Sequence, residues 1–485
     1  GHIYLRGYRF GFYLHYWSVC VMQHIHLIGI GGTGISAIAV VLLEQGYQVT
    51  GSDIADSTYF REVTRRGAKT VLGHDPSLAT QADVVVRSSA IKDDDPEVQA
   101  AQAAGIPVLK RTDFLPQLTA GKRTIAVAGS HGKTTTTAMI VCLLHNLAFD
   151  PSFILGAEII DLHANARAGS SPYFIIEADE YDNMFLGLNP TVSVITNIEY
   201  DHPDCFPTPE SYLEAFRQFL LRTQPSGTAL LCADDPGVQK LLQGFEAKDF
   251  VLRTYGFAEK SHYHIASADW NGEEYTFTLT RQLPGEEPHN LGSFRLPMPG
   301  KHNVSNAAAA LAVIDILGIP PKDAAEALAG FHGSERRMEV VFEQNGIVII
   351  NDYGHHPTQI AATLAALRQR YPQKKLWAIW EPHTYSRTEM LQDAYARSLQ
   401  AADEVVITRV YAAREAEHNF DPSQIAAHIP GGKARYLPDF DTLADYVCKN
   451  LSGDDVIVVL SAGKGPQISA LLQAHISSPK KEAQA

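Results

Sequence analysis

The chain has 485 residues, of which 45% are hydrophobic and 19% are charged. This length and composition predict two to four globular domains, with three as the starting expectation, and they argue against intrinsic disorder. The formal net charge is -14, with 54 acidic and 40 basic residues. An overall negative field disfavours nucleic acid and anionic membrane as partners, so an anionic small substrate requires a local basic or glycine-rich pocket.

The cysteines and the first residues bear on the compartment. Five cysteines are scattered without paired spacing or a zinc pattern, which favours reduced thiols and a cytoplasmic location. Residues 1–21 lack a long apolar core and a small-residue cleavage site, so we expect no secretory signal, and Met22 is a candidate natural start. We expect no nucleic-acid binding, no membrane insertion, and either a monomer or a weak homodimer.

The first domain is predicted over residues 22–114. A short apolar strand at residues 24–28 runs into Gly29-x-Gly31-x-x-Gly34 and then into a helical pattern. The order strand, turn, helix predicts a Rossmann-like, doubly wound α/β domain. Two further strands are predicted here, at residues 48–50 and 82–88.

The second domain is predicted over residues 115–330. An apolar strand at residues 124–128 enters the segment Gly-Ser-His-Gly-Lys-Thr-Thr-Thr-Thr, residues 129–137, which opens a helix. The alternating stretch at residues 274–279 predicts an antiparallel addition to a mostly parallel, P-loop-like sheet. Other strands of this sheet are predicted at residues 173–176, 192–196 and 229–232.

The same α/β pattern restarts after residue 330. Strands separated by helix-length segments predict a third domain, again Rossmann-like, over residues 331–475. The polar tail after residue 477 is expected to fray. The strands of the third domain are predicted at residues 347–351, 376–380, 404–408 and 456–460.

The first glycine loop allows backbone to approach a diphosphate and presents helix N-terminal amides to it. This pattern alone indicates a diphosphate and no particular ligand. It is compatible with NAD or FAD, in which case Asp53 after the second strand would hold a ribose, and also with a purely structural tight turn.

The segment at residues 129–137 is more specific. A glycine-rich turn, a lysine and a run of hydroxyls at a strand-to-helix junction together satisfy a triphosphate and its Mg²⁺. The spacing departs from the common motif, because Val127 stands where its first glycine would be. Lys133 is expected to contact the transferred phosphate, and Thr134 or Thr135 the metal.

Two predicted strands of the second domain end in acidic segments, residues 177–182 and residues 196–202. For any single acid there, a solvated turn or a helix cap is the more common role. Two such strand ends beside a phosphate loop nevertheless favour Mg²⁺ coordination.

Several motifs, taken in chain order, resemble the Mur ligase family. They are the Gly-x-His-Gly-Lys-Thr-Thr-Thr loop, the Glu-Ala-Asp-Glu and Thr-Asn-Ile-Glu-x-Asp-His strand ends, Pro-Gly-Lys-His-Asn-x-x-Asn at residues 299–306 and Asn-Asp-Tyr-Gly-His-His-Pro at residues 351–357. The resemblance covers residue 22 to about residue 472. Within the family, residues 29–34, 381–388 and 410–415 are most similar to the ligases that join L-alanine to UDP-N-acetylmuramate.

The resemblance implies an ATP-dependent ligase of peptidoglycan synthesis. By that resemblance, the first domain holds the UDP-sugar, the second holds ATP, and the third brings the amino acid and closes over both. ATP and Mg²⁺ are the implied cofactors. UDP-N-acetylmuramate and L-alanine are the implied substrates, joined through an acyl phosphate on the lactyl carboxylate.

The motifs and the resemblance together imply a set of site residues. The implied catalytic residues are Lys133, Glu177, His202, Arg337 and His355. The implied nucleotide-binding residues are Gly129, Ser130, His131, Gly132, Lys133, Thr134, Thr135, His302, Asn303, Asn306, Arg337 and Asp352. The expected substrate-binding residues are Gly31, Gly32, Thr33, Gly34, Asp53, Ser88, Ser89, Tyr353, His355 and Arg387. The implied metal ligands are Thr134, Glu177 and His202.

The chain departs from the family pattern in two places. Thr384 stands where an arginine often follows Pro-His, so one carboxylate contact is missing or supplied elsewhere. The helix that follows the metal histidine has no lysine at residues 214–219, so we do not expect the carbamylated lysine of some relatives.

Some side chains have two interpretations. His355 and His356 are suited to orienting or deprotonating an amine, yet a His-His-Pro turn can also simply cap a helix at Thr358. Arg336 is compatible with a surface ion pair. His74 and Arg111 are weaker candidates for contact with the substrate's phosphates.

Three other functions stay open on sequence alone. A recycling ligase that attaches a tripeptide to the same UDP-sugar needs a roomier pocket around Tyr353 and Arg387. A nicotinamide or flavin oxidoreductase would use the first glycine loop and would not need Lys133. A non-catalytic nucleotide-binding regulator would bind ATP without ligation.

Overall fold

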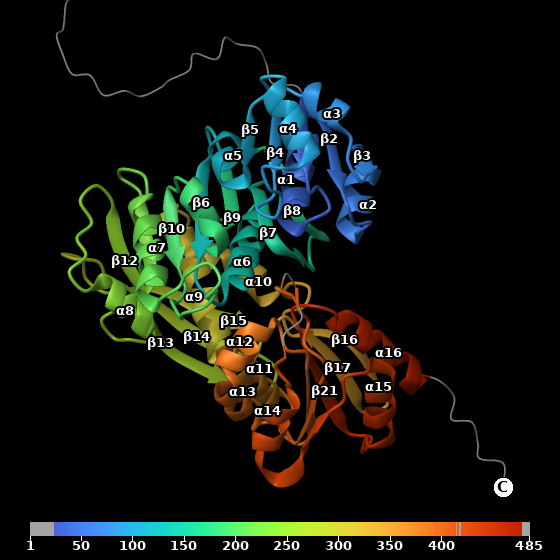
Figure 1. Cartoon of the computed structure of the whole chain (residues 1–485). Coiled ribbons are helices and arrows are strands. Elements are labelled where there is room, and N and C mark those ends of the chain that lie inside the picture. Colours follow the sequence, from blue (N-terminus) through green and yellow to red (C-terminus); the bar gives the residue numbers. More distant parts are fainter. Residues whose placement is uncertain (1–23, 414, 417–418, 478–485) are drawn as a thin grey trace, which may run out of the picture.

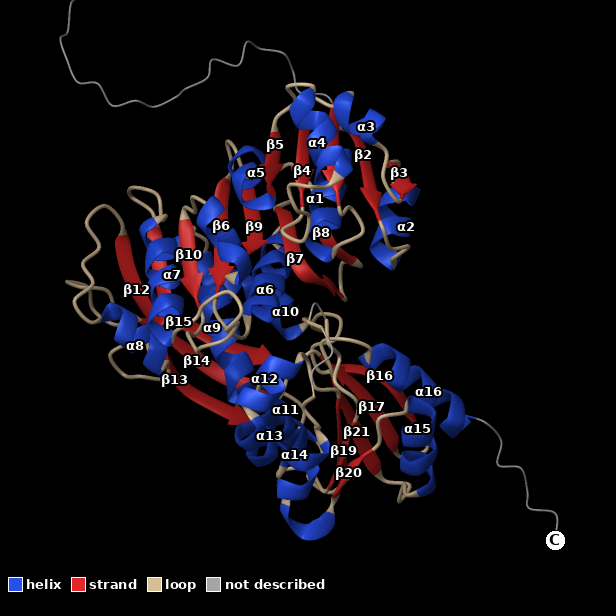
Figure 2. Ribbon diagram, viewed as in Figure 1, coloured by secondary structure: helices blue, strands red, loops and turns tan. Residues whose placement is uncertain are grey.

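The computed structural model describes residues 24–413, 415–416 and 419–477. The chain folds into three α/β units, each built around its own sheet (Figure 1, Figure 2). The predicted fold class is therefore confirmed. The described residues do not include residues 1–21, Met22 and the tail after residue 477. They also do not include Arg414, which belongs to the motif at residues 410–415.

The N-terminal sheet is fully parallel, with the strand order β3-β2-β1-β4-β5. The order reverses between β1 and β4, which is where a doubly wound sheet opens a crevice for a ligand. The strands are β1 (His24–Ile28), β2 (Gln48–Asp53), β3 (Lys69–Leu72), β4 (Val84–Arg87) and β5 (Val108–Lys110). The helices are α1 (Thr33–Glu44), α2 (Thr58–Arg65), α3 (Pro76–Thr80), α4 (Pro96–Ala103) and α5 (Arg111–Leu118).

The central sheet has the strand order β15-β14-β13-β12-β11-β10-β6-β9-β7-β8. Its middle is parallel, and β13, β14 and β15 form the antiparallel extension that the alternating pattern predicts. The strands are β6 (Arg123–Ala128), β7 (Ser152–Ile159), β8 (Ala164–Arg167), β9 (Tyr173–Glu177), β10 (Val192–Ile195), β11 (Thr228–Cys232), β12 (Val251–Gly256), β13 (Tyr263–Trp270), β14 (Tyr275–Arg281) and β15 (His289–Leu296).

Helices cover both faces of the central sheet, as the alternation along β6 requires. Ile125 and Val127 pack with α6 and α9, while Ala126 and Ala128 face the cluster that contains α7. The helices are α6 (Lys133–Asn146), α7 (Pro209–Leu221), α8 (Pro236–Leu242), α9 (Lys301–Ile316) and α10 (Ala325–Ala329), with the 3₁₀ segments η1 (Tyr181–Gly187) and η2 (Pro321–Ala324).

The C-terminal sheet has the order β16-β17-β21-β18-β19-β20 and is parallel except for the β16–β17 pair. Its strands are β16 (Glu339–Gln344), β17 (Ile347–Asp352), β18 (Lys375–Trp380), β19 (Glu404–Ile407), β20 (Ala434–Tyr436) and β21 (Asp455–Leu460). Its helices are α11 (Pro357–Arg370), α12 (Tyr385–Met390), α13 (Gln392–Leu399), α14 (Ser423–His428), α15 (Phe440–Lys449) and α16 (Gly465–Ser477), with the 3₁₀ segment η3 (Pro430–Gly432).

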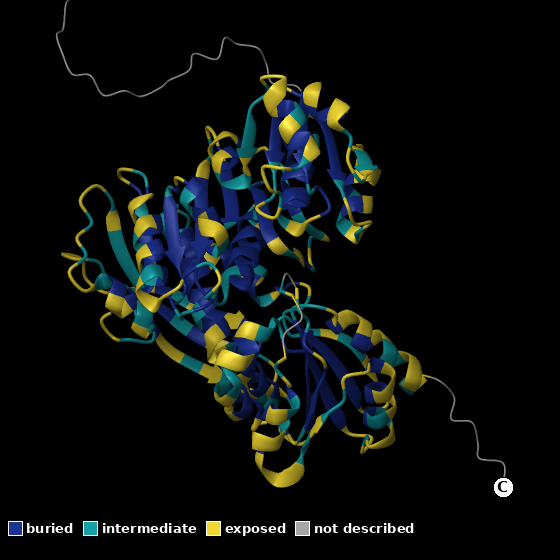
Figure 3. Cartoon of the chain, in the orientation of Figure 1, coloured by how far each residue is buried: buried dark blue, intermediate teal, exposed yellow. Residues whose placement is uncertain are grey.

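The three units are joined in different ways. One hydrophobic cluster runs from β1 and α1 into β6, β9 and α7, and α1 packs against β7 and β8 (Figure 1). The C-terminal sheet instead has two clusters of its own, one on each face. Its inner strands are coloured as buried in Figure 3. Because relative motion is the usual behaviour of units without a large apolar interface, polar contacts must set the position of the C-terminal unit.

The strands that the sequence predicts all form, within two residues at each end except for β2, which continues three residues past its predicted end. Other strands lie outside the prediction because they are short or partly exposed, and no residue of β16 or β20 is buried. Among the described residues, no helix is both long and apolar enough to cross a membrane.

A buried carboxylate lies inside the N-terminal unit. Glu97, at the start of α4, is fully buried; it accepts hydrogen bonds from the Ser52 hydroxyl and the Asp75 backbone amide (3.0 Å) and lies 3.2 Å from Nε2 of His26. Burial opposes its ionisation, but the hydrogen bonds from His26 and Ser52 outweigh burial and lower the pKa of Glu97 from 4.5 to about 2.

Glu97 should therefore stabilise the fold in a pH-dependent way. Its folded pKa lies below the ordinary value, so its contribution is complete above about pH 4.5 and is lost as the pH falls toward 2. We expect Glu97→Gln to lower the free energy of unfolding at pH 7 by a few kcal/mol, roughly 3 at most, and the difference from wild type to shrink between pH 5 and pH 3. Urea denaturation at several pH values checks this; a difference that stays constant with pH would contradict it.

Candidate functional site

The first glycine loop lies at the switch point of the N-terminal sheet. Gly29 has a φ of +81° and packs beside Ser88, which follows β4. Asp53 accepts a hydrogen bond from the Gly31 amide (2.9 Å), so this carboxylate supports the loop itself. A Cβ at Gly34 would overlap the guanidinium of Arg111, which therefore lies directly on the loop.

Other residues expected near this loop are placed less closely. Gly32 and Thr33 lie at the start of α1, and Ser89 is exposed in the turn after β4. His74 points elsewhere, because its Nδ1 lies 3.6 Å from Asp95 and 3.5 Å from Glu97. Of the two weaker phosphate candidates, the structure brings only Arg111 to the loop.

The second glycine loop, residues 129–132, joins β6 to α6. Gly129 and Gly132 have φ values of +142° and +80°, which side chains rarely adopt. A Cβ at Gly129 would overlap the Thr196 hydroxyl, and one at Gly132 would lie 2.7 Å from Oδ1 of Asn306. These glycines let the end of β10 and the start of α9 close around the loop, whose amides lead into the N-terminus of α6.

Lys133 is the first residue of α6, and its ammonium is buried beside the loop. Its Nζ donates to the Gly129 carbonyl (2.6 Å) and to Oε2 of Glu180 (2.8 Å). Burial would raise the pKa of Glu180, but the positive Lys133 and the nearby His202 lower it to about 2. The two side chains therefore form an ion pair, and a phosphate entering the loop would compete with Glu180 for this ammonium.

Thr134, Glu177 and Arg337 meet at the next position. The Thr134 hydroxyl lies 3.0 and 3.1 Å from the two carboxylate oxygens of Glu177, and Nη2 of Arg337 donates to the same hydroxyl (3.2 Å). Glu177 ends β9 in the central unit, whereas Arg337 belongs to the C-terminal unit. The hydroxyl and carboxylate oxygens suit Mg²⁺, which prefers oxygen ligands.

His202, the third implied metal ligand, has different neighbours. Its Nε2 lies 3.5 Å from Glu180 and 3.8 Å from Asp201, and among the described residues no hydrogen bond or ion pair joins it to Glu177. Burial lowers the pKa of His202, but the carboxylates of Glu180 and Asp201 outweigh burial and raise it above 6.5. The structure thus brings Thr134 and Glu177 together and places His202 beside Glu180.

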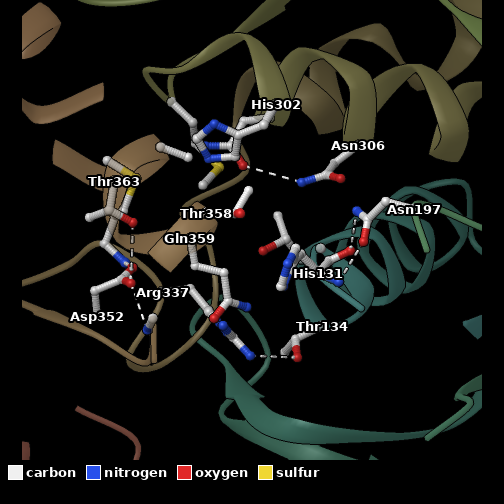
Figure 4. Close-up of a pocket in the computed structure, with 17 residues that line it drawn as sticks. His131, Thr134, Asn197, His302, Asn306, Arg337, Asp352, Thr358, Gln359 and Thr363 are labelled. Carbon is white, nitrogen blue, oxygen red and sulfur yellow. Dashed lines mark hydrogen bonds between the residues drawn. The ribbon is translucent and has the colours of Figure 1, made fainter. Parts of the chain in front are cut away.

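A cavity lies between the central and C-terminal units (Figure 4). Most of the implied nucleotide-binding residues line it; the exceptions are Gly129 and Ser130 in the adjoining loop and Lys133 at the start of α6. The expected residues on its wall are His131, Gly132, Thr134, Thr135, His302, Asn303, Asn306, Arg337 and Asp352. The residues on its wall that sequence reasoning did not assign are Asn197, Met298, Met338, Gly354, Thr358, Gln359, Ala362 and Thr363.

Two carboxylates hold the walls of this cavity. Asp352 is buried and accepts from the backbone amides of Met338 (2.9 Å) and Gly354 (2.8 Å), and burial raises its pKa. Glu199 accepts from the Thr358 hydroxyl of the C-terminal unit (2.6 Å) and lies 2.6 Å from Nε2 of His131. Asp352 therefore shapes the C-terminal wall, and Glu199 ties that wall to the phosphate loop.

The motif residues at the start of α11 take distinct positions. Nδ1 of His356 accepts from the Thr358 amide (3.4 Å), so His356 caps α11, as the structural interpretation of the His-His-Pro turn predicts. Arg336 makes no side-chain ion pair with the other described residues: its Nη2 donates to the Ser461 carbonyl (2.6 Å), and its guanidinium lies over the Tyr353 ring. Arg336 therefore connects the loop after β21 with the Tyr353 ring.

Tyr353, His355 and Arg387 gather in one region, together with His383 and Asp201. The His355 ring lies 5.5 Å from the Tyr353 ring and 5.6 Å from the His383 ring, and Nη1 of Arg387 lies 3.1 Å from Nδ1 of His383. Burial and Arg387 lower the pKa of His355 well below 6.5 and that of His383 to about 4. Burial opposes ionisation of Asp201, yet Arg387 outweighs it and holds the pKa of Asp201 well below its usual range.

Sequence reasoning gave no role to Asp201 or His383, although both lie within quoted motifs. Asp201 directly precedes His202, and His383 follows Pro382 in the segment that carries Arg387. Their positions in those motifs were the available signal. Asp201 and His383 both contact Arg387, which requires the docking of two units. Spacing in the sequence does not reveal this docking.

Models of known protein families match one region in each of the three units. Residues 24–123 match the Mur ligase family, catalytic domain, residues 127–314 match the Mur ligase middle domain, and residues 336–463 match the Mur ligase, glutamate ligase domain. A UDP-N-acetylmuramate–L-alanine ligase from Roseiflexus sp. (strain RS-1) is 40% identical over 463 residues, covering 93% of this chain and 98% of its own. One from Caldanaerobacter subterraneus subsp. tengcongensis is 38% identical over 448 residues, covering 91% of this chain and 95% of its own.

Solved structures show the same fold. The crystal structure of UDP-N-acetylmuramate–alanine ligase from Thermotoga maritima superimposes with a TM-score of 0.77 at 28% identity, covering 94% of this chain and 99% of its own. A murein peptide ligase from Psychrobacter arcticus gives a TM-score of 0.69 at 24% identity, covering 94% of this chain and 99% of its own, a similarity that concerns the fold alone. With three matching regions in order and relatives about 40% identical over nearly their full length, the chain belongs to the Mur ligase family.

Proposed function

We propose that this chain catalyses the ATP-dependent joining of L-alanine to the lactyl carboxylate of UDP-N-acetylmuramate, through an acyl phosphate, in peptidoglycan precursor synthesis. The observation that carries the proposal is the cavity at the second glycine loop, whose wall is completed by Arg337, Asp352 and Thr358 of the C-terminal unit. The names of the relatives support the choice of sugar nucleotide and amino acid.

The proposal divides the work among three domains. Residues 22–114 bind the UDP-sugar, and the loop that Arg111 covers is suited to its diphosphate. Residues 115–330 bind ATP through the second glycine loop. Residues 331–475 bind the amino acid around Tyr353, His355 and Arg387, which supports the positioning of an amine next to the activated carboxylate.

ATP is needed because a carboxylate does not react with an amine at pH 7, since its oxygen is a poor leaving group. Phosphorylation of the lactyl carboxylate gives an acyl phosphate, and the amine then displaces phosphate from the acyl carbon. Lys133, whose ammonium lies at the second glycine loop, and Arg337, which donates to the Thr134 hydroxyl, supply positive charge to the phosphoryl group in transfer.

Mg²⁺ fits part of the implied donor set. Thr134 and Glu177 already lie within 3.1 Å of one another and offer the oxygen ligands that this ion prefers. They would hold the ion at the start of α6, where it would neutralise charge on the phosphates. His202 is proposed to act from its position beside Glu180, where the carboxylates of Glu180 and Asp201 raise its pKa and favour the charged ring.

His355 is suited to receiving the amine of the amino acid. Its Nδ1 lies 3.1 Å from the Tyr353 carbonyl, an arrangement that assigns the hydrogen to Nδ1 and leaves a lone pair on Nε2. Because its pKa is far below 6.5, the ring is neutral at pH 7. Its proposed role is to orient the amine, and Arg387 is proposed to receive the carboxylate.

We also propose a cytoplasmic location and a monomer or weak homodimer. Cys142, Cys205, Cys232 and Cys448 are free thiols, which is consistent with a reducing compartment. ATP and a UDP-sugar as substrates would be supplied in the same compartment.

The substrate assignment is tested by acceptor-dependent ADP release. Purified protein is mixed with ATP, Mg²⁺ and UDP-N-acetylmuramate, and L-alanine, glycine, L-serine or the L-Ala-D-Glu-diaminopimelate tripeptide is supplied in turn. We expect the highest kcat/KM with L-alanine, because the region around Tyr353 and Arg387 is enclosed by His355 and His383. Turnover with the tripeptide alone would identify a recycling ligase instead.

Lys133→Ala should lower turnover by roughly 100- to 1000-fold, because it removes charge from the phosphoryl group in transfer. It should also remove the ammonium partner of buried Glu180 and lower the melting temperature. The double variant Lys133→Ala/Glu180→Gln should recover stability and stay inactive, whereas Lys248→Ala, an exposed lysine of the same domain, should match wild type. Steady-state ADP release and thermal melting measure both effects; an active Lys133→Ala enzyme would refute the role.

Gly34→Ala should raise the KM for UDP-N-acetylmuramate and leave the KM for ATP unchanged. The new Cβ displaces the flexible end of Arg111 from the first glycine loop while the backbone stays in place. Gly330→Ala is the matched control, since a Cβ there makes only ordinary contacts. Initial-rate kinetics with each substrate varied separately decides the point, and an equal rise in both KM values would contradict the local role.

A further inference from the structure

We propose that Asp201 is a positioning residue that holds Arg387 across the boundary between the central and C-terminal domains, so that the amino-acid pocket is complete only in the closed enzyme. The inference rests on the proposed function and adds a residue to which the sequence motifs assign no role.

The contact between the two side chains is close and buried. Nε and Nη2 of Arg387 lie 2.9 and 2.8 Å from Oδ1 of Asp201, and the backbone amide of His202 donates to the same oxygen (2.8 Å). Both side chains are 5% exposed. A buried charge is strongly disfavoured once its partner leaves, so each side chain needs the other in this position.

The hydrogen bonds of Arg387 leave part of its guanidinium without a partner among the described residues. Asp201 takes Nε and Nη2, while Nη1 is directed to Nδ1 of His383 at 3.1 Å. Nη1 carries two hydrogens, and no second acceptor for it is found among the described residues. A carboxylate can be received at Nη1, with the plane of the guanidinium already fixed by Asp201.

The pair also connects the amino-acid region to the phosphate site. Asp201 lies in the segment after β10 that carries Asn197, whose side chain binds the backbone of His131 in the second glycine loop. Nη2 of Arg387 lies 3.4 Å from Nδ1 of His202. The position of Arg387 is therefore set relative to the phosphate loop and not only within its own domain.

Domain opening would break this link. No apolar cluster of the described residues spans the central and C-terminal domains, so polar contacts such as this one fix their relative position. When the domains separate, Arg387 loses two of its hydrogen bonds and the fixed orientation that binding a small carboxylate requires. The amine is then positioned at the acyl phosphate only after closure, which is where positioning contributes to rate.

The test is Asp201→Asn, which keeps the size of the side chain and removes its charge. We expect the KM for L-alanine to rise roughly 10- to 100-fold, while the KM values for ATP and UDP-N-acetylmuramate change less than about 3-fold. Alanine-independent acyl-phosphate formation, followed by isotope exchange between ATP and ADP, should persist. Asp201→Glu, which restores the charge on a longer side chain, should lie between the two.

Asp403→Asn is the matched control, because Asp403 pairs with Arg368 at 2.8 Å within the C-terminal domain, and this variant should keep the wild-type KM for L-alanine. An unchanged KM for L-alanine in Asp201→Asn, or an equal rise for all three substrates, would overturn the proposal. Small-angle scattering with an ATP analogue gives a readout that needs no turnover: wild type should be more compact than Asp201→Asn, and equal dimensions would also overturn it.

The wild-type enzyme separates this proposal from the proposed function. If wild type shows no alanine-dependent turnover, the function assigned above fails, and the scattering comparison still decides the role of Asp201. If wild type uses L-alanine and the Asp201 variants behave like wild type in every measurement, the function stands and the positioning role fails.

Discussion

Strands β6, β9 and β10 end side by side at one edge of the central sheet. Glu177 is the last residue of β9, and the segments after the three strands place Lys133, Glu180 and His202 at the same edge. Charges gathered in a poorly solvated place must be balanced nearby, because each unpaired charge there is costly. Lys133 balances Glu180 inside the central domain. Asp201, in contrast, is balanced by an arginine from another domain, so the docking of the C-terminal domain follows from the charge on this edge.

The same requirement explains the composition of the cavity. Its central-domain wall consists of loop amides, hydroxyls and amide side chains, and its C-terminal wall adds Arg337 and residues held by Asp352. Neither wall alone surrounds a nucleotide. Because the interface is polar, the C-terminal domain can separate and return without exposing a large apolar surface.

Both glycine loops follow one physical rule in two different settings. Each lacks Cβ atoms where a neighbour approaches closely: Arg111 lies on Gly34, and Asn306 lies beside Gly132. In each case the neighbour comes from a distant part of the chain. The glycines therefore allow a second element to close over a phosphate-binding backbone, besides allowing the turn itself.

Local patterns in the sequence were sufficient for three α/β domains, for both glycine loops and for most of the cavity wall, because strand and helix periodicity and glycine-rich turns are short-range properties. They were insufficient for strands such as β16, which has three apolar residues in a row and no buried residue. Tertiary structure alone decided that His202 contacts Glu180, that His356 caps a helix, and that Arg387 pairs with Asp201, 186 residues away. The His202 contact depends on how two strand ends of the central sheet meet, and the Arg387 pair depends on how two domains dock. The His356 cap is local, and the structure chose it from the two roles that the His-His-Pro turn allows.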